Sequence, residues 1–470
     1  MVDATSSLID IISALVARDV SARELLDHHL ERIERLDGSI NSVVTIDTDR
    51  AQSEASAVDD ARSAGRPVGP LAGVPVTIKD AIATAGICST GGAIELGDHV
   101  PEVDATVVAT VREAGAVVFA KTNVPRWSGD YQTCNDMFGT TNNPWDVDRT
   151  PGGSSGGPAA AVAMGFTGFE IGTDIGGSIR VPSSFCGVYG HKPSFGIIPT
   201  FGYLDNPTSH RNVADINVFG PIARSVDDLE LLLGLLAGPN PEDAVAWSLD
   251  LPPARTNELR DFRVVAWLDD EFSPVDPAVR DVMKTAIAAL EGAGARIDHD
   301  RRPDIDPVVA AREGSILISM ATEISDSESE KSAASGSGRQ LDHRAWDVLH
   351  RRRGEMRQRW AEFFTDIDVL LCPVTVVPPF RHVHSTEGSN WANATLADHG
   401  DRPYSDLIGW SALIGSAYLP VTVPPIGRTA AGLPIGIQVV APYLHDRTSL
   451  AFARCMTDVL GGYEPPPAAR

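Results

Sequence analysis

Apolar residues recur at helical spacing near the start of the chain. Leu8, Ile11 and Leu15 lie three or four positions apart, which places them on one face of a helix. Ser21 and Glu24 have the spacing of a capping box, in which the two side chains close the first turn of a helix. We therefore predict helices within residues 5–37.

Further along the chain, short apolar runs alternate with helical patterns. Residues 41–46 predict a strand, and residues 48–64 predict a helix. Residues 73–86 contain a short apolar strand, and residues 104–125 predict a helix followed by a strand. This alternation is typical of βαβ units, in which helices join parallel strands.

The later pattern adds strands after a glycine-rich loop. Residues 150–165 predict this loop and a helix, and residues 168–174 predict a strand. Near the end, three apolar runs predict strands and a fourth predicts a helix: 368–374, 419–424, 434–442 and 446–460. We expect one mixed α/β domain over residues 5–465, with a helical part over 5–64 and a helical cap or insert over 302–364.

Composition and charge narrow the classes of function. The 470 residues are 43% hydrophobic, which is enough for a large buried core. The net charge of −24 argues against a nucleic-acid partner, because phosphates need a basic surface. We expect a small-molecule amide as the partner, with no nucleic acid, membrane or cofactor, and the sequence leaves a homodimer open.

Cysteine usage and the N-terminal sequence indicate the compartment. The five cysteines are scattered, which favours reduced thiols over disulfides or a zinc site. No basic run precedes an apolar stretch at the N-terminus, and no apolar run approaches the roughly 18 residues that span a bilayer. The histidines lack metal-ligand spacing, although His382 and His384 lie close together. We expect a cytoplasmic protein without a metal site.

Three short stretches carry candidate chemistry. They place Lys79 at the end of an apolar strand, Ser154 in the run GGSSGG and Ser178 in the run DIGGSIR. Each alone has an ordinary interpretation, because a strand-end lysine is usually solvated and a Gly/Ser cluster is usually a turn. Ser178 also lacks the G-x-S-x-G pattern of many serine hydrolases, since Arg180 occupies the place of the last glycine.

Other catalytic patterns fit the sequence poorly. No G-K-[ST] follows the glycines, which disfavours a phosphate-binding loop. The S-x-x-K pattern of penicillin-binding enzymes and the H-E-x-x-H pattern of zinc proteases are both absent. His191 is the histidine nearest to Ser178 in sequence, and we expect it to be structural rather than part of a Ser-His-Asp triad.

Taken together, the motifs resemble those of the amidase signature family of serine hydrolases. The resemblance extends over about residues 5–460 and is weakest between 240 and 365. Five segments carry it: 73–80, 150–165, 172–196, 220–233 and 433–453. It implies the fold of that family, in which a large mixed β-sheet is surrounded by α-helices and joined to a variable helical cap.

The resemblance implies a Ser–Ser–Lys triad in which Ser178 is the nucleophile. Ser154 would follow a non-proline cis peptide bond, Gly153–Ser154, and would carry the proton between Ser178 and Lys79. A free lysine has a pKa of about 10.4 and is protonated at neutral pH, but burial lowers this pKa by several units. The apolar sequence around Lys79 is compatible with burial, so a neutral lysine would replace the missing histidine.

The resemblance also assigns roles to the residues next to Ser178. Backbone amides of four consecutive residues would stabilise an oxyanion: Ile175, Gly176, Gly177 and Ser178. Asp174 and Arg180 flank this loop, and we expect them to hold its shape as an ion pair. Cys186 is expected to be a buried packing residue. Glu170 is an unusual residue for an apolar strand, and we expect no effect of it on activity.

A substrate pocket is expected beside the loop at residues 126–139. Trp127, Tyr131 and Phe138 offer an apolar wall, although each could equally belong to the core. Ser128 and Tyr131 are the candidate substrate-binding residues, and Ser128 is expected to contact the substrate through its backbone. Residues 302–364 and 202–207 are expected to supply the rest of the wall.

These observations favour a stand-alone amidohydrolase. We expect it to cleave the C–N bond of a small, neutral, partly apolar carboxamide by acyl transfer through Ser178. Esters, anilides and carbamates react in the same way and stay open as substrates. The first alternative is the glutaminase component of a tRNA-dependent amidotransferase, its A subunit, and the second is a catalytically silent binding protein.

Overall fold

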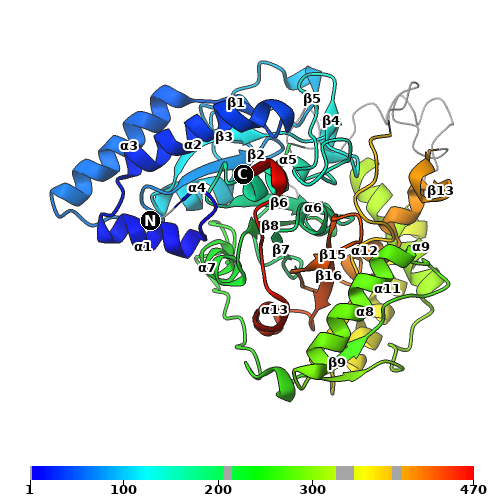
Figure 1. Cartoon of the computed structure of the whole chain (residues 1–470). Coiled ribbons are helices and arrows are strands. Elements are labelled where there is room, and N and C mark those ends of the chain that lie inside the picture. Colours follow the sequence, from blue (N-terminus) through cyan, green and yellow to red (C-terminus); the bar gives the residue numbers. More distant parts are fainter. Residues whose placement is uncertain (1–2, 205–213, 324–342, 384–393, 470) are drawn as a thin grey trace.

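A large mixed β-sheet forms the centre of the molecule (Figure 1). The computed structural model describes residues 3–204, 214–323, 343–383 and 394–469. The strands of this sheet are, in spatial order, β10 (Arg296–Asp298), β9 (Arg263–Ala266), β11 (Val369–Pro373), β16 (Pro434–Val440), β14 (Val421–Val423), β7 (Tyr189–Lys192), β8 (Val218–Ala223) and β6 (Glu170–Asp174), with β15 (Pro425–Arg428) paired to β16. Only β10, β9 and β11 are parallel, so the sheet is mixed, as expected.

A second, three-stranded sheet carries the candidate lysine. It consists of β1 (Val43–Ile46), β3 (Val117–Thr122) and β2 (Pro75–Lys79), in that spatial order. β2 and β3 are parallel, which confirms the predicted βαβ unit, and Lys79 is the last residue of β2. Two short hairpins complete the strands: β4 (Cys134–Asn135) with β5 (Gly139–Thr140), and β12 (Thr395–Leu396) with β13 (Arg402–Pro403).

Helices surround both sheets, as Figure 1 shows. In chain order they are α1 (Leu8–Ala17), α2 (Ala22–Leu36), α3 (Thr48–Ser63), α4 (Thr106–Glu113), α5 (Gly156–Met164), α6 (Arg180–Cys186), α7 (Val226–Leu236), α8 (Pro277–Gly292), α9 (Pro307–Glu323), α11 (His343–Phe363), α12 (Gly409–Gly415) and α13 (Asp446–Leu460). The capping box predicted from Ser21 and Glu24 is present at the start of α2.

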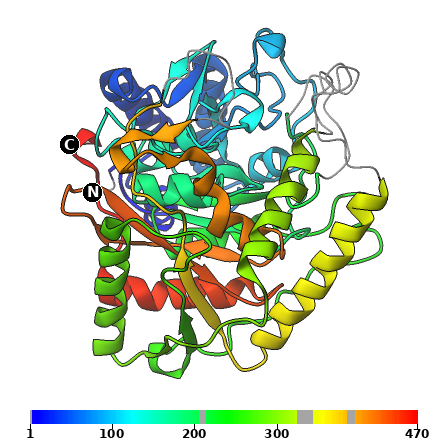
Figure 2. The same cartoon turned by 90° about the vertical axis from the view of Figure 1, so that its right-hand side faces the viewer.

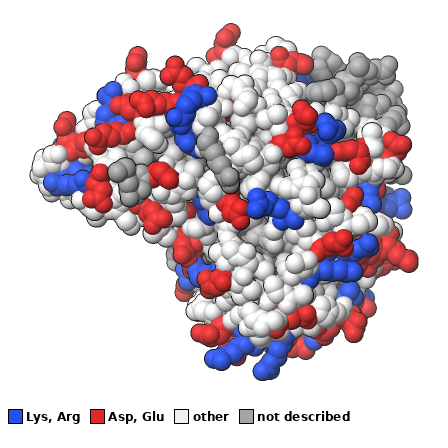
Figure 3. Space-filling view, in the orientation of Figure 1, with Lys and Arg blue, Asp and Glu red and all other residues white. Residues whose placement is uncertain are grey.

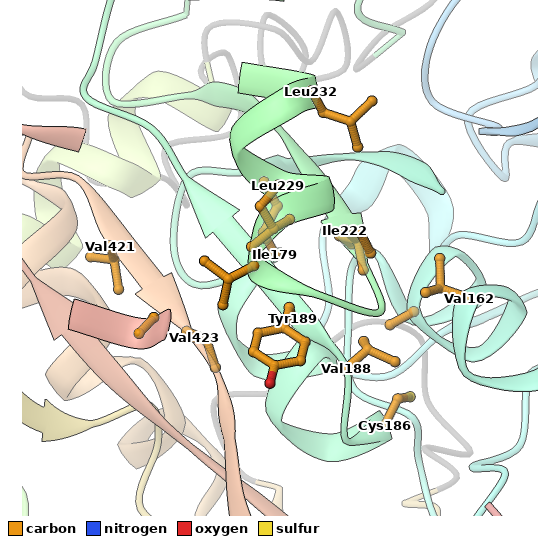
Figure 4. Packing of buried hydrophobic residues seen from close by; sticks show 14 of the residues in the cluster. Val162, Ile179, Cys186, Val188, Tyr189, Ile222, Leu229, Leu232, Val421 and Val423 are labelled. Atoms are coloured by element: carbon orange, nitrogen blue, oxygen red, sulfur yellow. The ribbon is translucent and has the colours of Figure 1, made fainter. Parts of the chain in front are cut away.

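A buried apolar core holds both ends of the loop that contains Ser178. Figure 4 shows Val162 of α5, Ile179 and Cys186 near α6, and Ile222 of β8 within this core. Every residue of α5 is buried, which explains its run of alanines, since small side chains let neighbouring backbones approach. Cys186 is fully buried, as expected of a packing residue.

The helices of the predicted cap region lie on one side of the sheet (Figure 2). α9 packs against α12 and α11, and residues 324–342 between the two helices lie outside the described part of the chain. The structure therefore places helices within residues 302–364. Whether this region acts as a cap stays a prediction, as do the domain limits.

The surface mixes the two signs of charge. On the face drawn in Figure 3, acidic and basic side chains alternate rather than gathering in separate patches. Across the described residues, no helix combines the length and the apolar character that crossing a membrane requires.

Candidate active site

The lysine at the end of β2 is fully buried. Its Nζ donates hydrogen bonds to Ser154 Oγ at 2.7 Å, Ser155 Oγ at 3.0 Å and Thr173 Oγ1 at 2.7 Å. All three acceptors are uncharged hydroxyl groups. A direct hydrogen bond therefore joins two of the predicted site residues, Lys79 and Ser154.

Burial controls the charge of this lysine. Loss of water around the ammonium group lowers the pKa of Lys79 to about 7, and the carboxylates of Asp174 and Glu170 only partly offset this effect. At neutral pH a group with this pKa is present in both its charged and its neutral form. Lys79 can therefore accept a proton under these conditions.

The backbone at Ser154 has the expected cis peptide bond, Gly153–Ser154. Only glycine fits before this serine, because a Cβ at Gly153 would lie 2.4 Å from the carbonyl oxygen of Asp130. Ser154 itself is fully buried, just ahead of helix α5. The loop that carries Ser154 is thus packed tightly against the segment around Asp130.

Ser178 lies between β6 and α6, beside the loop that carries Ser154. Its carbonyl oxygen accepts a hydrogen bond from the amide of Ser155 at 3.1 Å. The Ser178 residue is 8% exposed, and among the described residues its Oγ has no hydrogen-bond partner. The structure therefore brings the two serine loops together, and it leaves the Ser178 hydroxyl without a bond to Ser154.

A buried ion pair fixes the shape of the loop before α6. Arg180 Nη2 lies 2.8 Å from Asp174 Oδ1, and both side chains are fully buried. Burial alone would raise the pKa of Asp174, but the guanidinium of Arg180 outweighs it and holds that pKa below its ordinary value. Arg180 also donates to the carbonyl of Ser411 and to Gln438 Oε1, which ties the loop to α12 and β16.

Three of the four amides expected in the oxyanion hole are available. The amide of Gly177 donates to Asp174 Oδ1 at 2.9 Å, so this part of the expectation is corrected. Within the described chain, the amides of Ile175, Gly176 and Ser178 have no acceptor. Gly177 instead shapes the turn, because its φ of 118° belongs to a region that other residues rarely adopt.

The sequence did not reveal the place of Glu170. This residue of β6 is fully buried and accepts hydrogen bonds from Thr77 and Thr122, at 2.7 and 2.8 Å, and from the amide of Lys79 at 3.1 Å. Burial raises its pKa to about 7 although these hydrogen bonds oppose the shift. The available signal was an acidic residue inside an apolar strand, because buried carboxylates need partners.

The two candidate substrate-binding residues have different surroundings. The Ser128 hydroxyl is buried and has no hydrogen-bond partner among the described residues. Tyr131 donates to the carbonyl of Gly176 at 2.5 Å, so its hydroxyl holds the nucleophile loop, and burial raises its pKa. Trp127 packs against Gly91. Neither serine nor tyrosine is thereby assigned a contact with substrate, which stays a prediction.

An apolar cluster extends from the nucleophile loop to the predicted cap region. Buried Leu317 and Ile318 of α9 belong to it, and Ile175 and Ile408 pack against it. Ile408 also lies beside Gly176, since a Cβ on that glycine would be 3.4 Å from its Cδ1. Of the other expected wall, at 202–207, residues 205–207 lie outside the described structure.

His191 has structural contacts. Its Nδ1 pairs with Thr422 Oγ1 at 3.0 Å and its Nε2 with Asp446 Oδ1 at 3.1 Å, in a fully buried position on β7. In the part of the chain that the structure describes, no group of three or more acidic, histidine or cysteine side chains is placed to hold a metal ion. The chemistry of the site therefore depends on its hydroxyls, its lysine and its backbone amides.

Solved structures resemble the whole chain. A bacterial aryl acylamidase belonging to the amidase signature enzymes has a TM-score of 0.79 and 26% identity, covering 97% of this chain and 96% of that one. An inhibitor-bound chain from a complex described as revealing the evolutionary origins of an s-triazine catabolic enzyme has a TM-score of 0.80 and 25% identity, covering 97% and 99%. The fold is therefore that of known amidase signature enzymes.

Sequence relatives correct one of our expectations. The A subunit of the glutamyl-tRNA(Gln) amidotransferase of Synechococcus sp. (strain CC9605) is 32% identical over 480 residues, covering 93% of each chain. The expectation of no nucleic-acid partner is wrong on this ground, because the name of this relative refers to a tRNA. Net charge describes the whole chain and does not exclude a local role near an RNA.

The same full-length match extends to a family model. The model of the Amidase family matches residues 24–450, which include Lys79, Ser154, Ser178 and their hydrogen-bonded neighbours. Sequence, site geometry and overall structure thus agree. The chain belongs to the amidase signature family.

Proposed function

We propose that this protein cleaves the C–N bond of a carboxamide by acyl transfer through Ser178. The observation that carries the proposal is the buried Lys79, whose Nζ lies 2.7 Å from Ser154 Oγ. In this proposal Lys79 is the base, Ser154 passes the proton and Ser178 is the nucleophile. The hydroxyl partners of Lys79 support it, because a neutral amine has a lone pair that accepts a proton from a hydroxyl.

The first half of the reaction forms an acyl-enzyme. Ser178 Oγ attacks the carbonyl carbon as its proton passes through Ser154 to Lys79. The amides of Ile175, Gly176 and Ser178 stabilise the oxyanion, since fixed N–H donors need no rearrangement when the charge develops. The proton then returns along the same path to the leaving nitrogen, and the C–N bond breaks.

Water completes the reaction. The relay takes a proton from a water molecule, which attacks the acyl carbon of the ester on Ser178. Collapse of the second tetrahedral intermediate returns the proton to Ser178 and releases the carboxylic acid. The same steps would cleave esters, anilides and carbamates, because each forms the same acyl-enzyme.

The relatives favour glutamine as the carboxamide. We infer that the first candidate role is that of a glutaminase-type A subunit, because the matched relative of 32% identity is named as that component of a glutamyl-tRNA(Gln) amidotransferase. In this role the chain would release ammonia from the side chain of glutamine and would work with other subunits. Our expectation of a stand-alone amidohydrolase becomes the second candidate.

The apolar cluster supports the second candidate. Ile175, Ile408 and Leu317 would meet an apolar acyl group without leaving charges unpaired, whereas free glutamine brings an ammonium and a carboxylate. The solved aryl acylamidase of 26% identity is a relative with a name that agrees with this role. The two candidates share the same catalytic residues and differ in the acyl group.

One activity panel tests the chemistry and separates the two roles. Purified protein is assayed with glutamine, an aliphatic primary amide and an aryl anilide, alone and after co-expression with candidate partner proteins. Ser178→Ala is expected to abolish every activity, whereas Ser183→Ala is expected to retain it. Ser183 is the matched control, since it lies on α6 and its hydroxyl has no partner among the described residues.

Each result has a defined meaning. Glutamine hydrolysis that needs partner proteins supports the amidotransferase role, and hydrolysis of apolar amides by the chain alone supports the stand-alone enzyme. Activity that survives in Ser178→Ala contradicts the proposed nucleophile. Wild-type protein that cleaves none of the substrates, with or without partners, supports the silent binding protein instead.

A further inference from the structure

A cavity of about 600 Å³ lies apart from the residues of the candidate active site. Residues within 253–263, 357–368, 417–419 and 442–448 line it, so it lies between the C-terminal part of α11 and the start of α13. Both helices can be followed in Figure 2, in yellow and red. Among the described residues, no lining side chain bonds to Lys79, Ser154 or Ser178.

The charged lining of this cavity is mostly basic. Three arginines line it, together with one carboxylate, Asp368. Arg255 and Arg263 each lie 2.5 Å from an oxygen of Asp368, so that carboxylate is already shared between two cations. The third arginine, Arg357, adds a positive charge to a chain whose net charge is −24. The cavity is therefore a local exception to the acidic character of the protein.

Arg357 is held in place without an acceptor. Its guanidinium carbon lies 4.6 Å from the ring centre of Tyr418 and 4.9 Å from that of Tyr443. Contacts with two aromatic faces restrict the guanidinium plane, which reduces the entropy lost when a ligand binds. No described carboxylate forms an ion pair with Arg357, and no described acceptor takes one of its hydrogen bonds.

The rest of the lining favours a partly apolar ligand that carries negative charge. Phe364, Ile367 and Leu419 are buried apolar residues on its walls. The 15-residue helix α13 begins at the cavity, and its N-cap residue, His445, makes no side-chain capping hydrogen bond. The N-terminus of a helix carries partial positive charge and adds to the field of the arginines.

One acidic residue of α13 needs to be accounted for. Asp446 lies in the first turn of this helix and would repel an anion. Its carboxylate is fully buried and accepts hydrogen bonds from Ser194, at 2.7 Å from the hydroxyl and 2.8 Å from the amide, while His191 lies 3.1 Å away. These contacts engage Asp446 on the other side of the helix end, since none of its partners lines the cavity.

We propose that this cavity binds a small organic anion, with an oxyanion group on Arg357 and an apolar body against Phe364, Ile367 and Leu419. A planar guanidinium matches the two oxygens of a carboxylate, sulfonate or phosphate group. The volume falls within the roughly 300–1,000 Å³ of pockets that hold small organic ligands. The site is a second binding site, independent of the reaction at Ser178.

A fluorescent organic anion tests the proposal. The full chain is titrated with 8-anilinonaphthalene-1-sulfonate, as wild type, Arg357→Met and Arg351→Met. Arg351 is the matched control, because it lies on the same helix with a side chain that is 69% exposed. Loss of a charge-assisted hydrogen bond is expected to raise the Kd of the dye by about tenfold in Arg357→Met and to leave it nearly unchanged in the control.

Further arms of the same experiment define the ligand. Phenylacetate is expected to displace the dye at lower concentration than inorganic phosphate, because phosphate lacks an apolar body. Circular dichroism checks that each variant is folded. If Arg357→Met does not fold, Arg357→Lys keeps the charge without the planar fork and is expected to weaken binding to a smaller degree.

Three outcomes overturn the proposal. The first is a dye affinity that is unchanged in a folded Arg357 variant. The second is an equal loss of affinity in Arg357→Met and Arg351→Met, which shows a nonspecific effect of charge. The third is displacement by phosphate at lower concentration than by phenylacetate, which refutes the apolar part of the ligand.

Discussion

Two buried lysines lie on adjacent, hydrogen-bonded strands of the small sheet, and they have different surroundings. Lys79 ends β2, and Lys121 lies on β3, where it pairs in register with Ile78. Both side chains are fully buried, and burial lowers the pKa of Lys79 to about 7 and that of Lys121 to about 8. Burial alone therefore does not distinguish a base from a structural lysine.

The hydrogen-bond partners distinguish them. Lys79 Nζ contacts only hydroxyl groups, and one of them, Ser154, lies on the loop next to Ser178. Lys121 Nζ donates to the carbonyl oxygen of Ile82 at 2.5 Å and to Thr84 Oγ1 at 2.7 Å. A carbonyl accepts protons but has none to give, so the surroundings of Lys121 favour a fixed donor. The comparison teaches that a candidate base is recognised by what its partners can donate.

The largest expected effect comes from the first lysine. Lys79→Met removes the proposed base while it keeps a side chain of similar length, so kcat/KM is expected to fall on the order of 10²–10⁴-fold. The protein is expected to stay folded, because the variant removes a buried charge whose partners are neutral hydroxyls. Steady-state kinetics and thermal unfolding measure both quantities. Unchanged kcat/KM would show that Lys79 is not the base.

The same substitution at the second lysine is expected to act on stability. Lys121→Met leaves the carbonyl of Ile82 and the hydroxyl of Thr84 without a donor, and it removes the cation near the buried Asp80. The free energy of unfolding is expected to fall by about 1–3 kcal/mol, with little change in the kcat/KM of the folded protein. Denaturant unfolding provides the test, and a variant as inactive as Lys79→Met would remove the distinction between the lysines.

The smallest expected effect concerns Glu170, which lies between the two lysines. Its carboxylate favours the charged form of Lys79, so Glu170→Gln is expected to lower the pKa of that lysine. The base is then neutral at lower pH, and the rising part of the pH–rate profile moves to lower pH. A structural role alone would reduce the rate without this shift. A profile that stays in place, or moves to higher pH, would contradict the electrostatic role.

The sequence predicted most elements of the fold because their patterns are local. Periodic apolar residues mark α1 and α2, and the capping box at Ser21 marks where α2 begins. The order of strands in the large sheet is a different matter, since β7 pairs with β14 across more than 200 residues of chain. Such pairings depend on packing in three dimensions, and no short segment encodes them.

The candidate site was predicted in part, through residues whose motifs are contiguous. Lys79, Ser154 and Ser178 each stand in a short motif, and the structure places their loops together. The engagement of the Gly177 amide by Asp174 was missed, because the direction of a single N–H depends on the folded loop. The contacts of Glu170 were missed for a related reason, since its partners come from three separate strands.

The pH dependence of the wild-type rate tests the central claim most directly. Lys79 must be neutral to accept a proton, so kcat/KM for one cleavable amide is expected to rise with pH and to level off above its pKa of about 7. This rise is expected to persist in Lys121→Met, because that lysine takes no part in the reaction. A rate that does not change across this range, or a rise that disappears in Lys121→Met, would contradict the assignment of Lys79 as the base.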